Sequence, residues 1–335
     1  MADEELDELE QQQELYEHHR IVVDRGQELL RIDRYLQCHL SNVSRNKIQA
    51  AAKAECILVN DHPVKPNYRV KPLDVISVLL PEPPHEFELI PEQINFPIVY
   101  EDNDVLVIDK PAGLVVHPGV GNWTGTLVNG LLYYLGNNAQ PYLVHRIDKD
   151  TSGLLLVAKT EEAQVVLARQ FFYHTIERRY RALVWGDFEE DSGTIVGNLA
   201  RSPRDRRIMA VCDDEHGKNA ITHWRVVERF GYVTLVECQL ETGRTHQIRA
   251  HMRHIGHPLF SDASYGGDAI LKGTTFSRYR QFVENCFAVL PRQALHAMVL
   301  GFEHPTTGKH LHFESPMPPD FEACLERWRN YVASH

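Results

Sequence analysis

Residues 143–154 read Leu-Val-His-Arg-Ile-Asp-Lys-Asp-Thr-Ser-Gly-Leu, and this stretch carries five ionisable side chains within six positions. In an extended segment the side chains alternate, so Arg146 and Asp148 project to one side while Ile147 projects to the other. An aspartate held beside an arginine stays ionised at neutral pH and is fixed in orientation. The apolar run that begins at Leu154 predicts a buried strand. The pattern suits a catalytic carboxylate in the turn before that strand, and it suits a surface loop with a local ion pair equally well.

A second charged stretch, residues 240–251, reads Leu-Glu-Thr-Gly-Arg-Thr-His-Gln-Ile-Arg-Ala-His. Its apolar spacing predicts a helix over residues 245–255, with Arg249 in the first turn beside Ile248. A cation in the first turn opposes the helix dipole, which costs about 0.3 kcal/mol. An anionic partner would offset this cost, and Asp148 is the candidate that the sequence offers. The alternative is that Arg249 is an exposed surface residue.

Residues 21–80 have the pattern of a small separate module. Apolar residues at helical spacing predict two short helices, and short strands and turns follow them, so we expect a compact α+β unit. The stretch 31–80 has eight Lys or Arg against four Asp or Glu. Such a basic surface suits a nucleic acid, although it also suits a merely solvated face. The candidate RNA-contacting side chains on the exposed helix faces are Arg34, Arg45, Lys47 and Lys53.

Composition divides the rest of the chain. Residues 1–20 hold eight acidic residues and one arginine, and we interpret them as an acidic tail, either a frayed helix or a disordered segment. Residues 81–97 contain five prolines and are predicted to be a linker, because proline removes a backbone donor and breaks regular helix. Residues 98–335 are rich in predicted strands. The expected domains are therefore the tail, the module over 21–80, the linker and one large domain.

The chain has 335 residues, a net charge of −11 and 43% hydrophobic residues, which is typical of a soluble protein of about two domains. No apolar run reaches the ~18 residues that a membrane helix needs. The N-terminus lacks the basic start and apolar core of a secretory signal, so we expect a cytoplasmic protein. The acidic tail carries −7 of the net charge, which leaves basic patches elsewhere that suit phosphate backbones.

Three common catalytic patterns do not fit. The glycines of residues 119–125 resemble a dinucleotide-binding loop, but the last glycine is one residue late. Ser152 lacks the preceding glycine of a serine hydrolase elbow. The four histidines within residues 246–257 do not form the HExxH zinc motif, and the arginines among them would repel a metal ion. We therefore expect neither a metal nor a nucleotide cofactor.

Residues 145–153, His-Arg-Ile-Asp-Lys-Asp-Thr-Ser-Gly, resemble the HR(L/I)DxxTSG signature of RluA-type pseudouridine synthases. The resemblance continues in order over residues ~98–320, and its further blocks are Lys110–Gly113 with Val116–Gly119, Arg179–Ala182, Gly243–Arg249 with Gly256–Leu259 and Asp262, and Arg292–Ala297 with His304 and Pro305. Residues 116–122 look most like the branch that acts on large-subunit ribosomal RNA. Residues 31–80 resemble the S4 RNA-binding module.

The resemblance implies an isomerase that converts uridines of RNA into pseudouridine and requires no cofactor. It assigns the role of nucleophile or base to Asp148, with Arg249 as its ionic partner and Tyr180 as an aromatic face and hydroxyl beside the target base. The uridine must first leave its stack. Attack at C6, attack at C1′ and removal of a proton from C2′ all remain open.

Four further residues form the expected substrate-binding set. Ile248 would pack against the other face of the uracil, and Arg146 would fill the vacated stack and reach phosphate. Arg244 belongs to the same block as Arg249. His145 belongs to the signature, where it could instead be a local turn partner.

The expected fold is therefore α+β, with a small S4-like module before a catalytic domain that has a mixed, mostly antiparallel sheet. We expect a monomer whose partner is RNA, most of all ribosomal RNA, and not a membrane. Transfer RNA as the substrate is one alternative, and a non-catalytic RNA-binding protein is another. A hydrolase that uses Asp148 with Asp150 or Asp262 is a third. The sequence offers no interpretation of the acidic tail or of residues 266–291.

Overall fold

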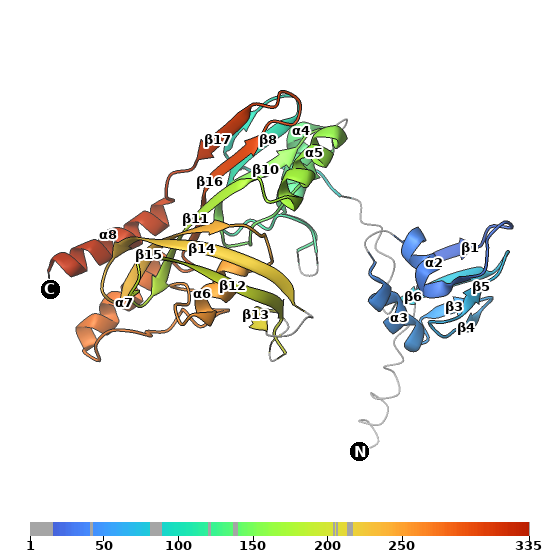
Figure 1. Ribbon diagram of the computed structural model, residues 1–335, viewed down its shortest axis with the longest axis horizontal. Coiled ribbons are helices and arrows are strands. Elements are labelled where there is room, and N and C mark those ends of the chain that lie inside the picture. Colours follow the sequence, from blue (N-terminus) through green and yellow to red (C-terminus); the bar gives the residue numbers. More distant parts are fainter. Residues whose placement is uncertain are drawn as a thin grey trace, which may run out of the picture. The chain divides into compact units, whose positions relative to one another are not determined.

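The computed structural model describes residues 16–40, 43–80, 89–119, 122–136, 140–203, 205, 207–212 and 217–334. The chain divides into two compact units, one within residues 1–88 and the other within 89–335 (Figure 1). No helix in the described ranges is long and apolar enough to cross a membrane.

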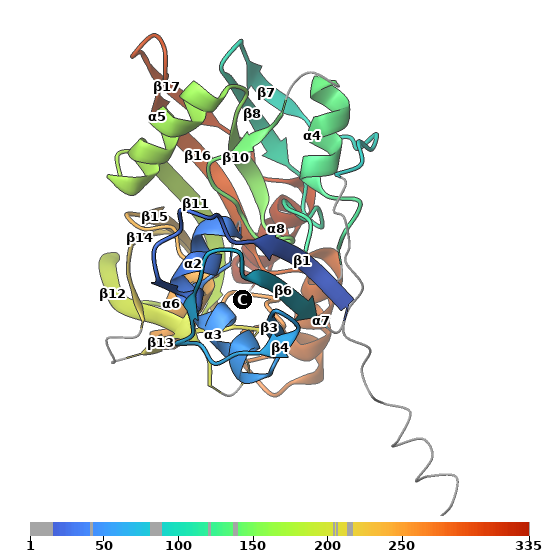
Figure 2. The same ribbon diagram turned by 90° about the vertical axis from the view of Figure 1, so that its right-hand side faces the viewer.

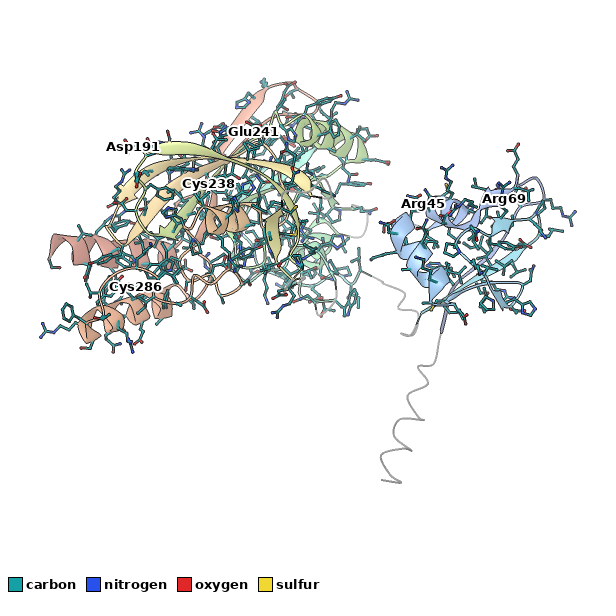
Figure 3. All side chains as sticks on the ribbon, turned by 60° about the horizontal axis from the view of Figure 1, so that its bottom comes forward. Arg45, Arg69, Asp191, Cys238, Glu241 and Cys286 are labelled. Atoms are coloured by element: carbon teal, nitrogen blue, oxygen red, sulfur yellow. The ribbon has the colours of Figure 1, made fainter. Side chains whose placement is uncertain are left out.

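In its described residues, the N-terminal unit combines a four-stranded antiparallel sheet, in the order β1-β6-β3-β4, with two helices and a two-stranded ladder of β2 and β5. Ser44 caps the second helix by accepting a hydrogen bond from the Lys47 amide, as its position in the sequence predicts. Arg45 and Arg69 are labelled on this unit in Figure 3. Its elements are β1 (Tyr16–Val22), β2 (Leu30–Arg31), α2 (Ile32–His39), α3 (Arg45–Lys53), β3 (Ile57–Val59), β4 (His62–Pro63), β5 (Arg69–Val70) and β6 (Val75–Leu80).

Strand β1 corrects the expected extent of the acidic tail. The tail was expected to reach residue 20, yet β1 begins at Tyr16 and pairs with β6, with Ile21 opposite Ile76. Ile21 packs against the core of the unit and Val23 is fully buried there. Alternating apolar positions after the acidic run therefore add a strand to the sheet. Residues 1–15 lie outside the described residues.

In the described part of the second unit, eleven strands form one sheet (Figure 2). The path runs β13-β12-β14-β15-β11-β16-β10-β8-β7, with β17 against β16 and β9 against β10. Neighbouring strands are antiparallel except β10 and β16, so the expected mixed, mostly antiparallel sheet is confirmed. Its strands are β7 (Ile98–Glu101), β8 (Val105–Lys110), β9 (Tyr142–Leu143), β10 (Ser152–Ala158), β11 (Glu177–Trp185), β12 (Ser192–Arg201), β13 (Met209–Cys212), β14 (Lys218–Arg229), β15 (Val233–Leu240), β16 (Leu295–Glu303) and β17 (His310–Glu314).

Helices pack on both faces of the two central strands. On β10, Leu155 packs in the cluster that holds α4 (Leu127–Leu135), while Leu154 packs in the cluster that holds α5 (Glu161–Phe172). On β11, Val184 shares its cluster with α6 (Gln247–His254). Its neighbour Trp185 packs with α7 (Ser277–Val289) and α8 (Pro319–Ala333). The whole of α7 lies in the stretch 266–291 that the sequence left uninterpreted, and it covers this second cluster.

The second half of the proline-rich segment belongs to the second unit. The Glu92 carboxylate accepts a hydrogen bond of 3.0 Å from the Gly125 amide, just before α4. The Asn129 side chain of α4 donates to the Ile90 carbonyl at 2.9 Å. Residues 89–97 are therefore tied to the start of α4 rather than being a free linker. The first half of the segment lies outside the described residues.

Gly153 provides a test of the contact between β10 and β16. It lies opposite Ala297, its φ is +112°, and an added Cβ would lie 2.2 Å from the Ala297 carbonyl oxygen. We expect Gly153→Ala to lower the free energy of unfolding by about 3 kcal/mol or more, because backbone strain and a steric clash add together. Gly113→Ala is the matched control, since Gly113 has φ +86° and open space around a Cβ. It should cost only about 1–2 kcal/mol in urea unfolding, and equal losses for both variants would contradict the close contact.

Candidate active site

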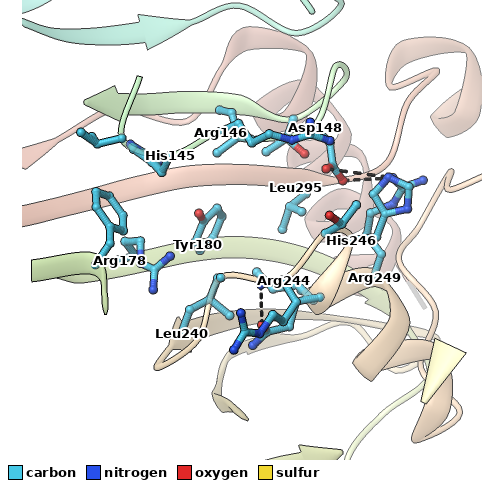
Figure 4. A pocket seen from close by; sticks show the side chains of 18 of the residues that line it. His145, Arg146, Asp148, Arg178, Tyr180, Leu240, Arg244, His246, Arg249 and Leu295 are labelled. Atoms are coloured by element: carbon cyan, nitrogen blue, oxygen red, sulfur yellow. Dashed lines mark hydrogen bonds and ion pairs between the residues drawn. The ribbon is translucent and has the colours of Figure 1, made fainter. Parts of the chain in front are cut away.

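A pocket of about 730 Å³ brings the two charged stretches together (Figure 4). It is lined by residues 144–148, the end of α5, strand β11 and residues 243–249. This volume lies within the range of small-molecule binding pockets. A second cavity of about 440 Å³ shares Arg146, Asp148 and Arg249 with the first, so Asp148 lies between two open spaces.

Arg249 lies between two carboxylates. Its Nη1 donates to Asp148 Oδ2 at 3.0 Å, so the two charges expected to pair are in contact. Its Nε and Nη2 donate to Asp262 Oδ2 and Oδ1 at 2.7 and 2.8 Å. The Asp262 side chain is 1% exposed and that of Asp148 is 19% exposed. Asp262 is therefore a buried anchor, while Asp148 keeps an open side toward solvent.

The charge of Arg249 is secured by its surroundings. Burial alone would lower its pKa, but the hydrogen bonds and negative charges of Asp262 and Asp148 outweigh burial and raise the pKa above its usual value. The guanidinium carbon also lies 4.8 Å from the centre of the Tyr265 ring, at the distance of a cation–π contact. Arg249 therefore stays charged and is held from three sides.

Helix α6 begins later than expected, and its start is tied to the sheet. His246, expected inside the helix, precedes it with a left-handed φ of +53°. Gln247 Oε1 accepts hydrogen bonds from the Arg244 amide at 3.0 Å and the Thr242 hydroxyl at 2.8 Å. Gln247 Nε2 donates to the Ile221 carbonyl at 2.9 Å. These bonds fix the first turn, where Arg249 was expected to lie.

Tyr180 on β11 and Ile248 on α6 belong to the apolar part of the pocket lining. Both are buried, and both belong to the core cluster on this side of the sheet. Burial raises the pKa of Tyr180, an effect that the positive charge of Arg178 opposes and the negative charge of Asp148 supports, so the hydroxyl keeps its proton at neutral pH. The two side chains offer an aromatic face and an aliphatic surface to a planar ring.

The other three expected substrate-binding residues also line the pocket, but they differ in exposure and in the hydrogen bonds that their side chains make. Arg146 is exposed and borders both cavities. Arg244 Nε donates to the Asn219 carbonyl at 3.1 Å. His145 Nε2 accepts a hydrogen bond of 2.8 Å from the Leu156 amide. Burial, together with the charge of Arg178, lowers the pKa of His145 to about 3, so its ring is neutral and supports the backbone of β10.

The four basic candidates of the N-terminal unit also differ from one another. Arg34, Lys47 and Lys53 are exposed on α2 and α3. Arg45 is engaged, because its guanidinium forms an ion pair of 3.0 Å with the fully buried Asp33. Three of the four are therefore free to face a ligand as expected, and the fourth also holds the two helices together.

Sequence reasoning missed the roles of three residues. Asp262 was noted as part of a motif and as a second acid in the hydrolase alternative, and nothing in its spacing shows that it anchors Arg249. Lys110 was noted only as part of a motif, yet it is fully buried, and its ammonium donates to the carbonyls of Pro111, Leu114 and Lys149 at 2.8 to 2.9 Å. Arg178 lines the pocket two residues before Tyr180, and strand alternation could have indicated it.

Two groups of metal-ligating side chains lie outside the pocket. Among the described residues, the candidate ligand atoms of each group lie within 4.8 Å of one another, and the groups are Glu177 with His310 and His312, and Asp102 with Asp104 and His304. In the second group both ring nitrogens of His304 are already in use, one with Asp102 and the other with the amides of Thr306 and Thr307. Neither group includes a residue that lines the pocket.

Comparison with known proteins agrees with this geometry. Residues 104–254 match the family described as RNA pseudouridylate synthase, and residues 30–76 match the S4 domain. An "Uncharacterized RNA pseudouridine synthase" of Chlorobaculum parvum is 47% identical over 93% of this chain and 98% of that protein. A "Ribosomal large subunit pseudouridine synthase D" of Zymomonas mobilis is 42% identical over 88% of this chain and 93% of that protein.

A solved structure gives the same answer for the fold. The structure of human RNA Pseudouridylate Synthase Domain Containing 1 superposes on this chain with a TM-score of 0.53 at 26% identity. The superposition covers 73% of this chain and 97% of the human chain. The pocket with its paired charges therefore lies in the domain that the relatives share. The chain belongs to the RNA pseudouridine synthase family and carries an S4 domain before its catalytic domain.

Proposed function

We propose that this enzyme converts specific uridines of large-subunit ribosomal RNA into pseudouridine, with Asp148 as the nucleophile or base that acts on a flipped-out uridine. The single observation that carries the role of Asp148 is its contact with Arg249 at the edge of the pocket. The Asp148 carboxylate lies 3.0 Å from Arg249 Nη1, and the Asp148 side chain is 19% exposed. A charged, oriented and accessible carboxylate is what nucleophilic or base catalysis requires.

The choice of RNA rests on the relatives. The Zymomonas mobilis protein and a Nitrosomonas europaea protein that is 43% identical both carry the name ribosomal large subunit pseudouridine synthase D. The S4 domain with exposed Arg34, Lys47 and Lys53 suits recognition of RNA shape and backbone. These features favour ribosomal RNA over transfer RNA.

The reaction breaks the bond between N1 of the uracil and C1′ of the ribose, turns the base and joins C5 to C1′, while C5 loses its proton and N1 gains one. It is an isomerisation without a redox step. Asp148 could attack C6 or C1′, or remove the C2′ proton, and each of these steps requires its carboxylate beside the reacting nucleotide. Arg249 would keep that carboxylate aimed, because its other donors are fixed on Asp262.

The other pocket residues have supporting roles in this proposal. Tyr180 would lie against one face of the uracil and Ile248 against the other. Arg146, which is exposed and borders both cavities, would enter the gap that the flipped base leaves in the RNA. A hydrolase with Asp262 as a second acid fits poorly, because both Asp262 oxygens are bound to Arg249.

The first test replaces the carboxylate of Asp148. We expect Asp148→Asn to lower pseudouridine formation by roughly a thousandfold or more while RNA affinity stays close to that of the wild type, because the amide has nearly the same shape but no negative charge. Purified protein and a ribosomal RNA fragment serve for both assays. Asp268→Asn, at an exposed position, is the control and should retain activity. Unchanged turnover of Asp148→Asn would refute its catalytic role.

A second test removes the anchor of Arg249. Asp262→Asn should reduce kcat/KM by roughly 10–100-fold, since a misaimed Arg249 no longer orients Asp148. It should also lower the free energy of unfolding by about 3 kcal/mol, because a buried arginine loses a bidentate partner. Glu228→Gln, in an exposed pair with Arg329, is the control and should cost less than about 1 kcal/mol. Normal kcat/KM in Asp262→Asn would show that the anchor does not serve the reaction.

The substrate is tested in cells that lack this protein. Pseudouridine mapping of ribosomal and transfer RNA should show sites in large-subunit ribosomal RNA that vanish, return with the wild-type chain and do not return with Asp148→Asn. Lost sites in transfer RNA alone would contradict the proposed substrate. No lost site in either RNA pool would contradict the proposed function in these RNAs.

A further inference from the structure

Arg178 is a buried cation without a matching anion. It lies on β11, is 6% exposed and lines the pocket. Its Nε atom has no hydrogen-bond partner. Among the described residues no carboxylate forms an ion pair with it, and its hydrogen bond to the Glu241 carbonyl is long, 3.4 Å from Nη2. The other buried arginine of the pocket, Arg249, is bound by two carboxylates.

The surroundings of Arg178 hold its guanidinium in place without neutralising it. Its guanidinium carbon lies 5.3 Å from the centre of the Phe171 ring. Its Nη1 lies 2.5 Å from the position that a Cβ on Gly243 would occupy. The absence of a side chain on that glycine therefore makes room for the guanidinium. The nearby ring of His145 is neutral. The guanidinium is therefore positioned by packing rather than by charge.

Such an arrangement lowers the stability of the folded protein when no RNA is bound. An unpaired charge and an unsatisfied donor both lose solvation when they are buried. The cost of the unpaired charge is reduced when a ligand brings an anion to the guanidinium. Arg178 lines the pocket two residues from Tyr180 on the same strand, beside the proposed base site (Figure 4).

We propose that Arg178 binds a phosphate oxygen of the RNA strand that enters this pocket. The inference rests on the proposed function and adds a backbone-binding subsite to it. In RNA at neutral pH the phosphodiester groups carry the negative charge, whereas the uracil carbonyls are neutral. A guanidinium also matches the geometry of phosphate oxygens better than an ammonium does. A phosphate therefore compensates the buried charge.

The test is the salt dependence of RNA binding. Full-length protein carrying Asp148→Asn, so that the RNA does not react, is titrated with an RNA that the wild type modifies, at several salt concentrations. Adding Arg178→Gln should weaken binding about tenfold and make the slope of log K against log salt concentration shallower by about 0.7, the value for one phosphate contact on single-stranded nucleic acid. Arg178→Lys should keep most of the slope. Arg179→Gln is the matched control, because Arg179 already pairs with Glu177, and it should leave affinity and slope unchanged.

A melting experiment separates this role from a structural one. If Arg178 serves the ligand, Arg178→Gln without RNA should melt at or above the temperature of the parent protein, because a buried unpaired charge is removed. Marked destabilisation together with an unchanged salt slope would make Arg178 a structural residue and overturn the proposal. Weaker binding with an unchanged slope would indicate contact with a neutral group such as a uracil carbonyl, and it would also overturn the proposal.

Neutral phosphate analogues supply a further test, in which the RNA is changed as well as the protein. Replacing each phosphate near the target uridine by a methylphosphonate should reveal one position that weakens binding in the Asp148→Asn protein but not when Arg178→Gln is also present. Equal effects in both proteins at every position would overturn the proposal. Turnover by Asp148→Asn on the same RNA would instead overturn the proposed function, so the two failures are distinguishable.

Discussion

Arg249 and its two carboxylates form the contact on which the rest of the site depends. One edge of the guanidinium is fixed on the buried Asp262, and the remaining nitrogen reaches the more exposed Asp148. A carboxylate beside a cation remains charged, and a cation with a second buried anion cannot follow its partner into solvent. The pair is therefore held by the fold, which leaves one side of Asp148 for substrate.

The fold provides this contact by joining distant segments. Asp148 and Arg249 are separated by 101 positions in the chain, and they meet because β10, β11 and the start of α6 share one core cluster. The N-terminal unit uses a similar device. Burial alone would raise the pKa of Asp33, but hydrogen bonds from Arg31, Gln49 and Arg45 lower it well below its usual range. In both units a buried aspartate fixes an arginine side chain.

Much of this could be predicted from the sequence, because motifs and alternating patterns are local. The two charged stretches, the first-turn position of Arg249 and the mixed sheet were all expected. The anchoring role of Asp262 and the burial of Lys110 were not, because each depends on long-range packing. The strand that begins at Tyr16 was hidden by the acidic run before it. Arg178 shows the limit most clearly, since its spacing from Tyr180 is visible but its lack of an anion is not.

The most direct test of the account is a structure of the full chain carrying Asp148→Asn in complex with its RNA. We expect the target base to lie outside its stack and inside the pocket, between Tyr180 and Ile248. Its ribose or its C6 should lie beside the side chain at position 148. Arg249 should remain bound to Asp262. A target uridine that stays stacked in the RNA, or that enters the pocket with its ribose and C6 far from position 148, would contradict it.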